Sequence, residues 1–394
     1  MDFCGVLGAV LDVRIMKSSM GWLLLLGWMV TFPVFAQEAP VSDAEALRRR
    51  ARERALTFLA EKGLAEDGSF TRKVGAGITA LAVTAALRNG RAVDDPLVAK
   101  GLQALESFVQ PDGGIYGGDR LKNYETCVCV VTFAEANADG RYNKILENAN
   151  KFLRGLQEGD QPGKESNDPW YGGVGYAGAG RPDLSNTTYF VEALQAIGAE
   201  DDDPAIQRAL AFINRCQNLD GHGNDTRFAQ LVNDGGFYYS IPVGNANQEY
   251  EQDSQRYTAN GGLRSYGSMT YSGLKSMIYA GLDKDDPRVK AALEWIRQNY
   301  SVETNPGQGE AGLYYYYHTF GSAFHAADVD QFTDAQGNER NWRHDLIQAL
   351  VQRQNADGSW TNSNRQWFEN DPNLATSFAL IALSYCRPAE AIND

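Results

Sequence analysis

One short phrase constrains this chain more than any other feature, because it recurs along the whole sequence. It is a loop that joins glycine to an aromatic or apolar residue. Its copies read EDGSF at 66–70, PDGGI at 111–115, WYGGVGY at 170–176, NDGGFYY at 233–239, EAGLYYYY at 310–317 and QNADGSW at 354–360. The chain between two copies of the phrase forms one repeated unit, and a unit that short cannot bury its apolar surface alone, so neighbouring units must stack. The sequence therefore predicts a repeat architecture rather than a series of unrelated domains.

Segments that precede several of these loops predict amphipathic helices with one common start. They read VDDPLVAKGLQAL (93–105), DDDPAIQRALAFI (201–213) and KDDPRVKAALEWI (284–296). In each, an aspartate stands at the N-cap position, where it accepts a hydrogen bond from a free helical N–H, and the proline that follows has no N–H to lose. Apolar residues then recur at i, i+4 and i+7, which places them on one helical face.

The segments that follow the loops have a different character, since they carry apolar or small residues nearly all round. They lie at 75–87, 124–136, 184–197, 267–280, 316–327 and 371–384. Helices of this kind are buried. The unit is therefore an amphipathic helix, a loop and a buried helix. Six such units predict an all-α, closed double ring, an (α/α)6 toroid with the buried helices inside.

The loop phrase also carries a family resemblance. QNADGSW resembles the QW-type repeat of the prenyltransferase and squalene-cyclase (terpenoid cyclase) superfamily, and the resemblance covers about residues 45–390. The stretches at 181–194, 261–282 and 312–320 are similar to an exported bacterial branch usually labelled cyclase-like. The resemblance implies an (α/α)6 toroid. It also implies a central cavity for an apolar, isoprenoid-like molecule.

The N-terminus has the pattern of a secretory signal peptide. Lys17 precedes an apolar run, which ends at small residues before Ala36. We expect cleavage after Ala36 and an exported protein, periplasmic or secreted; an uncleaved signal would be its membrane anchor. Met16 is an alternative start to residue 1. Residues 1–36 are thus predicted as an extension plus signal peptide, and 37–394 as a single toroid domain.

Charge and cysteine content limit the partners and the chemistry. The formal net charge is −14, and no long basic run occurs, which argues against binding to nucleic acid. An apolar small molecule or lipid is the expected partner. Four cysteines lie outside the signal segment, too few for a disulfide scaffold, although a single bridge stays open. They are Cys127, Cys129, Cys216 and Cys386.

The established catalytic motifs of the superfamily are not found. A squalene-cyclase acid motif reads Asp-x-Asp-Asp, and the full match at 283–286 precedes Pro287 at the start of an amphipathic helix, where it reads as a helix cap. The zinc site of protein prenyltransferases needs Asp-x-Cys and a histidine. The stretch YYYHTF at 315–320 resembles the histidine part and makes His318 the counterpart, but Asp-x-Cys is missing. No metal and no cofactor are predicted.

Candidate site residues lie where loops enter the predicted inner helices, which would meet at one rim of a closed ring. If the chain is an enzyme, we expect Asp183 or Asp371 as an acid, with His318 and Tyr317 as a proton-handling pair. The expected binding residues are Arg181, Arg264, Tyr238, Tyr266, Tyr271, Tyr315 and Trp360, with Arg264 as an anchor for an anion. The alternatives are helix capping for the aspartates and core packing for the aromatic residues.

Three functions remain open at this point, and so does the question whether the chain is an enzyme. The first is an exported toroid that binds or converts an isoprenoid-like molecule. The second is a non-catalytic binding or scaffold ring. The third is a polysaccharide-active (α/α)6 enzyme, which would need two carboxylates about 5–10 Å apart across the cavity.

Overall fold

The structure is a computed structural model of the chain, and it describes residues 43–159, 166–178, 180–242 and 255–387. The described residues all belong to one compact unit. The predicted signal peptide, its cleavage after Ala36 and the two candidate starts lie outside the described residues and stay predictions.

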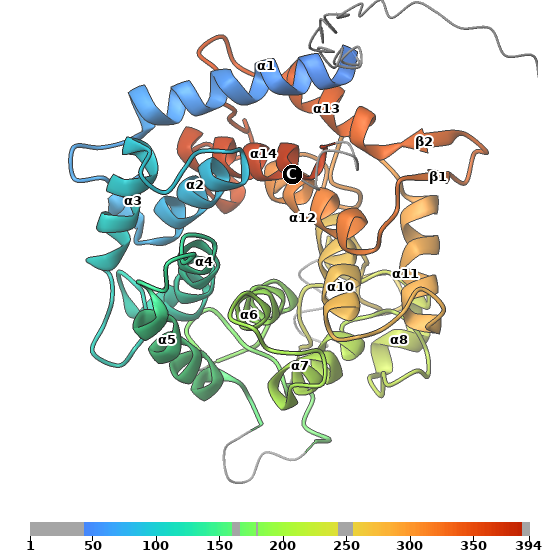
Figure 1. The fold of residues 1–394 in the computed structure, drawn as a ribbon. Helices are drawn as coiled ribbons and strands as arrows, with labels where there is room; N and C mark the ends of the chain where they lie inside the picture. Colours follow the sequence, from blue (N-terminus) through green and yellow to red (C-terminus); the bar gives the residue numbers. More distant parts are fainter. Residues whose placement is uncertain (1–42, 160–165, 179, 243–254, 388–394) are drawn as a thin grey trace, which may run out of the picture. The chain divides into compact units, whose positions relative to one another are not determined.

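Inner helices form a closed ring in the described part of the chain (Figure 1). They are α2 (Gly77–Arg88), α4 (Lys122–Glu135), α6 (Leu184–Ala196), α10 (Gly267–Tyr279), α12 (Leu313–Ala326) and α14 (Pro372–Tyr385). Each packs against the next, and α14 packs against α2, so the ring has no open edge. All six coincide with the segments predicted to be buried, and the (α/α)6 toroid is confirmed.

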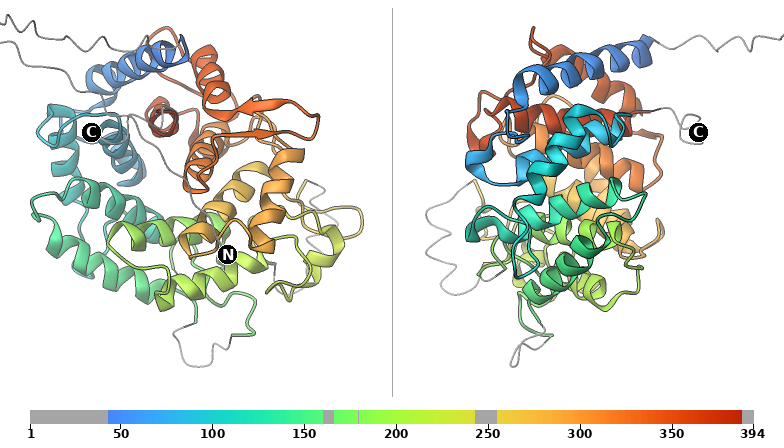
Figure 2. Two further views of the ribbon diagram at one scale, coloured as in Figure 1. Left: turned by 45° about the vertical axis from the view of Figure 1, so that its right-hand side comes forward. Right: turned by 60° about the vertical axis from the view of Figure 1, so that its left-hand side comes forward.

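The outer ring consists of helices that run along the inner ones, as the turned views show (Figure 2). They are α1 (Asp43–Phe58), α3 (Pro96–Glu106), α5 (Asn143–Leu156), α7 (Pro204–Arg215), α11 (Pro287–Gln298) and α13 (Trp342–Arg353). Asp95, Asp203 and Asp286 cap α3, α7 and α11 as predicted, with carboxylate to backbone N–H distances of 2.8–2.9 Å. Capping by Asp286 also accounts for the acid-like motif at 283–286.

Some short elements were not predicted. They are helix α8 (Arg227–Val232) and an antiparallel hairpin of β1 (Gln331–Thr333) and β2 (Glu339–Asn341), together with single turns at Leu59–Gly63, Arg72–Val74, Asp119–Leu121 and Gln366–Phe368. Elements of three to six residues are too short to show a hydrophobic period, which is why no sequence pattern indicates them. They lie in the connections between ring helices and leave the ring itself unchanged.

The recurring loop is tied to the inner helix that follows it. The aromatic or apolar residue that follows the glycine of the loop donates its backbone N–H to a threonine hydroxyl in the first turns of that helix, at 2.9–3.1 Å. The pairs are Phe70–Thr79, Ile115–Thr126, Val174–Thr187, Phe237–Thr270 and Trp360–Thr376. The copy at 310–317 departs from this pattern, because the N–H of Tyr315 instead donates to Glu369 at 2.7 Å.

In three of the units a glutamine at the start of the loop joins the unit to its neighbour. Gln354 donates its side-chain amide to the carbonyl of Gly358 and to that of Ala51 in α1, both at 2.9 Å. Gln157 and Gln217 make the same pair of bonds to their own loop and to the next outer helix. In the last copy this bond joins the end of the chain to its first described helix, which closes the ring.

Within the described residues no helix is both long and apolar enough to cross a bilayer. The four cysteines named above are buried thiols, and the structure forms no disulfide between them.

We predict that Gly358→Ala destabilises the ring more than Gly337→Ala does. Both glycines have positive φ, +92° and +83°, so both substitutions carry backbone strain of roughly 1–2 kcal/mol. Only at Gly358 would the new Cβ meet a backbone carbonyl, that of Arg54, at 2.4 Å, whereas Gly337 has open space. The clash should add about 1–3 kcal/mol, measured as free energy of unfolding in urea. Equal losses in the two variants would contradict this account of the loop.

Candidate functional site

Side chains that face the ring axis can be identified because they meet across it. Tyr315 of α12 contacts Ser185 and Tyr189 of α6, although α10 stands between these helices in the ring. The Tyr315 hydroxyl lies 2.9 Å from Ser185 Oγ, and the ring centroids of Tyr315 and Tyr189 are 6.3 Å apart. Because α6 and α12 are not neighbours, these contacts cross the interior and mark the helix faces that turn toward the axis.

The axis-facing residues follow the helical period. They are Ser185, Tyr189 and Glu192 on α6, Ser272, Lys275 and Tyr279 on α10, and Tyr315 and His318 on α12. Steps of three and four residues keep a side chain on one helical face. Each inner helix therefore brings a short stripe of side chains to the interior.

A group of tyrosines, here named the tyrosine cluster, occupies the end of the ring where the inner helices begin. Its members are Tyr124, Tyr176, Tyr189, Tyr239, Tyr266 and Tyr315. Tyr124 contacts Tyr189 and Tyr176 at centroid distances of 5.2 and 6.2 Å. All members except Tyr189 are partly accessible. Their partial exposure indicates that the loops at this end of the ring do not cover these side chains completely.

Asp183 lies beside this cluster as the N-cap of α6. Its Oδ1 accepts a hydrogen bond from the backbone N–H of Asn186 and its Oδ2 one from the Asn186 side chain, both at 2.8 Å. The residue is only 3% exposed. Burial raises the pKa of Asp183 to about 6, although hydrogen bonds from Asn186 and Tyr239 and the charge of Arg181 favour the carboxylate. The carboxyl can therefore be protonated near neutral pH.

Asp371, the other predicted acid, is held in a different way. It caps α14, where Oδ1 accepts hydrogen bonds from the N–H groups of Asn373 and Leu374. Its Oδ2 accepts a third bond from the Thr71 hydroxyl at 3.0 Å. Oδ1 therefore caps the helix, and Oδ2 joins the helix to the first unit. This is the capping role that the sequence analysis gave as the alternative to an acid.

His318 lies deeper in the ring, beyond Tyr315. Its imidazole stacks on Phe378 with a centroid distance of 5.6 Å, and the side chain is buried. Burial lowers the pKa of His318 to about 3, and the positive charge of Lys275 acts in the same direction. The imidazole is neutral at physiological pH, and its Nδ1 has no hydrogen-bond partner within the described residues.

Two ion pairs, here named the charged layer, lie below the tyrosine cluster. Lys275 contacts Glu192 at 2.8 Å, and Arg88 contacts Glu135 at 2.6 Å. Burial alone would raise the pKa of Glu192, but the charge of Lys275 outweighs it and brings the value to about 2. Two cations and two carboxylates balance, so this layer has no net charge.

The structure brings several predicted site residues together. Asp183, Tyr266, Tyr315 and His318 lie around the ring interior. Arg181 is exposed, and it lies near enough to Asp183 to act on its pKa. Arg264 is also exposed, and its guanidinium donates to the carbonyl of Tyr257 at 2.9 Å.

Other predicted residues do not reach the interior, because the helical period turns them toward the core between the two rings. Tyr271 packs against Phe320 and Phe324, one position away from the axis-facing Ser272. Tyr317 donates its hydroxyl to the carbonyl of Val302 at 2.6 Å and does not pair with His318. Tyr238 and Trp360 likewise bond to carbonyls of outer helices, those of Arg215 and Leu350.

Sequence reasoning missed the charged layer and part of the tyrosine cluster. The signal for Glu192 and Lys275 was present, because each is a charged residue within an otherwise apolar helix, and such a residue is buried only when it is paired. Tyr176 and Tyr239 stand in the recurring loop itself, where repetition indicates an architectural role and does not distinguish residues of a site.

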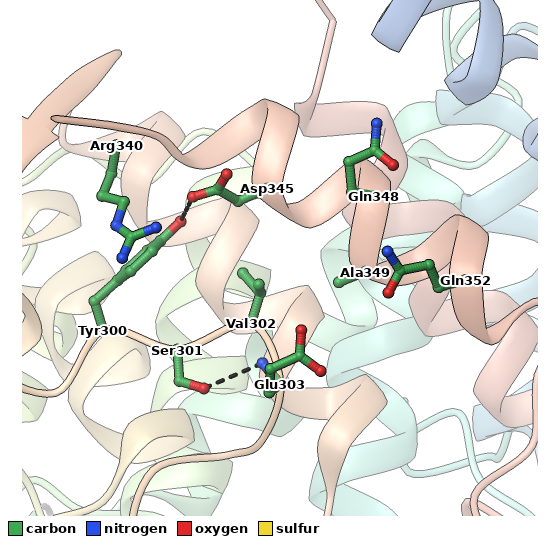
Figure 3. A pocket seen from close by; sticks show the side chains of 9 residues that line it. All are labelled: Tyr300, Ser301, Val302, Glu303, Arg340, Asp345, Gln348, Ala349 and Gln352. Atoms are coloured by element: carbon green, nitrogen blue, oxygen red, sulfur yellow. Dashed lines mark hydrogen bonds between the residues drawn. The ribbon is translucent and has the colours of Figure 1, made fainter. Parts of the chain in front are cut away.

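No three His, Cys, Asp or Glu side chains of the described residues lie close enough to hold a metal ion. A separate polar pocket of about 320 Å³ lies at the outer ring, between α13 and the chain that leads from α11 to α12 (Figure 3). There Tyr300 donates its hydroxyl to Asp345 at 2.8 Å, and Gln348 and Gln352 project from α13. This pocket contains no residue of the tyrosine cluster.

Comparison with known families gives one match. The squalene-hopene cyclase C-terminal domain family matches residues 51–241, which run from α1 to the loop before α10. This region includes Asp183, Tyr176, Tyr189 and Tyr239. No curated protein is similar enough in sequence to match the chain.

Solved structures show the same fold at low identity. A D-mannose isomerase has a TM-score of 0.55 and 12% identity, over 88% of this chain and 98% of its own. A glycoside hydrolase family 76 mannosidase from Bacteroides thetaiotaomicron VPI-5482 has a TM-score of 0.50 and 10% identity, over 86% and 97%. A type II terpene cyclase from Scytonema has a TM-score of 0.38 and 16% identity, over 89% of each chain. The first two likenesses show the fold alone.

We predict that Asp183→Asn removes a pH dependence of stability. The pKa of Asp183 is raised from its ordinary 3.8 to about 6, so the folded protein binds this proton more tightly than the unfolded chain does. This proton contributes roughly 3 kcal/mol to the free energy of unfolding below about pH 4, and the contribution is lost as pH rises through about 6. Asparagine keeps the helix cap without the charge. Urea unfolding at pH 5 and pH 8 should show the wild type losing more stability than the variant; parallel losses would contradict the raised pKa.

We also predict that removing one partner of the ion pair between Lys275 and Glu192 destabilises the protein more than removing both partners. Lys275→Met leaves the Glu192 carboxylate buried without its partner and should cost about 3–5 kcal/mol of unfolding free energy. The double variant Lys275→Met with Glu192→Leu should recover most of this loss, because no unpaired charge remains. A double-mutant cycle by urea unfolding measures the coupling. Additive losses would show that the two side chains do not interact.

Proposed function

Since the chain belongs to the prenyltransferase and squalene-cyclase superfamily, we propose that it binds an apolar, isoprenoid-like molecule inside its ring and that Asp183 acts on this molecule as an acid. The observation that carries the proposal is the setting of Asp183. Its carboxyl is buried, has a raised pKa and borders the tyrosine cluster. A carboxyl that stays protonated up to about pH 6 beside aromatic faces suits acid chemistry on an apolar substrate.

The tyrosine cluster supports the binding part of the proposal. Aromatic rings offer large apolar faces for a hydrocarbon chain, and contacts such as Tyr189 with Tyr315 and with Tyr124 hold those faces in place. The same faces attract cations, which stabilises a positive charge on a bound hydrocarbon. A rigid aromatic surface thus serves both the ground state and a charged intermediate.

Protonated Asp183 supplies the proton in the proposed reaction. The π electrons of a substrate alkene form a new C–H bond with that proton, the carboxylate remains on Asp183, and the other alkene carbon becomes a cation. Attack by the π electrons of a second alkene closes a ring. Water then takes a proton from a carbon next to the cation, the C–H electron pair forms a new alkene, and Asp183 regains its proton from solvent. Because the pKa of Asp183 is about 6, the acid form is depleted above that pH and conversion should decline.

The carbohydrate alternative is less well supported by the interior. Its carboxylates on α6, Asp183 and Glu192, are nine positions apart, which is roughly 13 Å at the helical rise. That separation exceeds the range of about 5–10 Å in glycoside hydrolases. Glu192 is moreover engaged with Lys275. A scaffold ring without a ligand remains as the outcome in which no binding is observed.

We predict that Asp183→Asn abolishes conversion of an isoprenoid alkene, while Asp371→Asn does not. Both variants keep an N-cap on an inner helix, but only Asp183 borders the tyrosine cluster, so its loss should lower the rate by about 100-fold or more. The assay incubates the protein with farnesene or squalene at pH 5.5 and measures cyclic products by gas chromatography and mass spectrometry, with hydrocarbon binding measured in parallel.

Retained binding with lost conversion in Asp183→Asn supports both parts of the proposal. Equal conversion by Asp183→Asn and the wild type would remove Asp183 as the acid. Absence of binding to any isoprenoid by the wild type would overturn the proposed function itself and favour a scaffold ring.

A further inference from the structure

Two buried polar atoms in the ring interior have no partner, and the proposed function leaves both unused. They are the hydroxyl of Tyr189 and Nδ1 of His318, on side chains that are 7% and 3% exposed. Within the described residues neither atom finds a hydrogen bond. A buried polar atom without a partner is costly. Other buried polar atoms of the described residues, such as Asn89 Oδ1 and Ser276 Oγ, also lack a partner, but Tyr189 and His318 come from different helices and both contact Tyr315.

The two atoms belong to one neighbourhood. Tyr189 of α6 and His318 of α12 both pack against Tyr315, at centroid distances of 6.3 and 6.4 Å. The charge of Glu192 also influences the pKa of each, which places both side chains near the charged layer. A tyrosine hydroxyl and a neutral imidazole can each donate or accept a hydrogen bond. Together they suit a group that does both, as an alcohol does.

We infer that the bound isoprenoid-like molecule carries a hydroxyl group, which binds between Tyr189 and His318. Its hydrocarbon chain then lies along the tyrosine cluster toward Asp183. The inference rests on the proposed function and narrows its ligand class from isoprenoid hydrocarbons to isoprenoid alcohols.

The charge balance of the interior argues against an anionic head group such as a diphosphate. His318 carries no positive charge at neutral pH, because burial lowers its pKa to about 3. Lys275 and Arg88 are the cations near it, and each is already paired with a carboxylate, Glu192 or Glu135. A dianion placed here would lose its hydration without gaining an unpaired cation. A neutral hydroxyl loses much less on burial and gains two partners.

The experiment compares three ligands that share one hydrocarbon chain but differ at its end. Farnesol carries a hydroxyl, farnesene carries none, and farnesyl diphosphate carries an anion. Dissociation constants for the purified full chain are measured at pH 7 by isothermal titration calorimetry. We expect farnesol to bind about tenfold more tightly than farnesene, as one net hydrogen bond would give, and farnesyl diphosphate to bind most weakly.

Variants then assign the preference to the two side chains. Tyr189→Phe and His318→Phe keep an aromatic ring and remove the polar atom, so each should reduce the farnesol preference to within about twofold. Tyr271→Phe is the matched control, since it removes a tyrosine hydroxyl that lies between the inner and outer helix rings, and it should leave the preference intact. Urea unfolding of each variant shows whether it has kept its fold.

The outcomes separate this inference from the proposed function. Equal binding of farnesol and farnesene by the wild type would overturn the hydroxyl subsite and leave the proposed function standing. Tightest binding of farnesyl diphosphate would overturn it in favour of an anion site. If the preference survives in both Tyr189→Phe and His318→Phe, the hydroxyl binds elsewhere. Failure of all three ligands to bind would overturn the proposed function as well.

Discussion

The ring depends on the bonds that join its last loop to its first described helix. Gln354 reaches the carbonyl of Ala51, and Arg54 donates to the carbonyl of Asn355 at 2.8 Å. Gly358 allows the two backbones to approach, since a Cβ there would meet the carbonyl of Arg54. Without this closure, α14 and α1 would expose apolar faces that no neighbour covers. The tyrosine cluster depends on the same closure, because its members come from helices and loops of different units that meet only in a closed ring.

Closure also determines where polar groups can be placed. An inner helix is covered by the outer ring on one side and by its neighbours on two others, so the axis-facing stripe is the part that these helices leave uncovered. Glu192, Lys275 and His318 all lie on such stripes. Burial shifts the pKa of His318 downward and that of Asp183 upward, whereas pairing with Lys275 keeps Glu192 ionised. One interior thus holds a carboxyl that can be neutral, a neutral imidazole and a balanced ion pair.

The sequence allowed the architecture to be predicted, because its signals were local and repeated. Asp-Pro starts, helical periods and the glycine loop each identify an element within about one helical turn, as Asp286 at the start of α11 illustrates. The site was only partly predictable, because which face of a helix turns toward the axis depends on packing. Among consecutive tyrosines, Tyr315 faces the axis and Tyr317 the core, and no local rule distinguishes them. Short elements such as α8 were missed for lack of a period.

The central claim is that the ring interior holds an isoprenoid alcohol. Native mass spectrometry of the full chain, purified from its own cells without added ligand, tests this claim most directly. The account predicts one bound molecule per chain, with the mass and fragmentation of an isoprenoid alcohol, and its loss from the Tyr189→Phe, His318→Phe double variant. A chain that is empty in every preparation, or that carries a sugar in place of an isoprenoid, would contradict it.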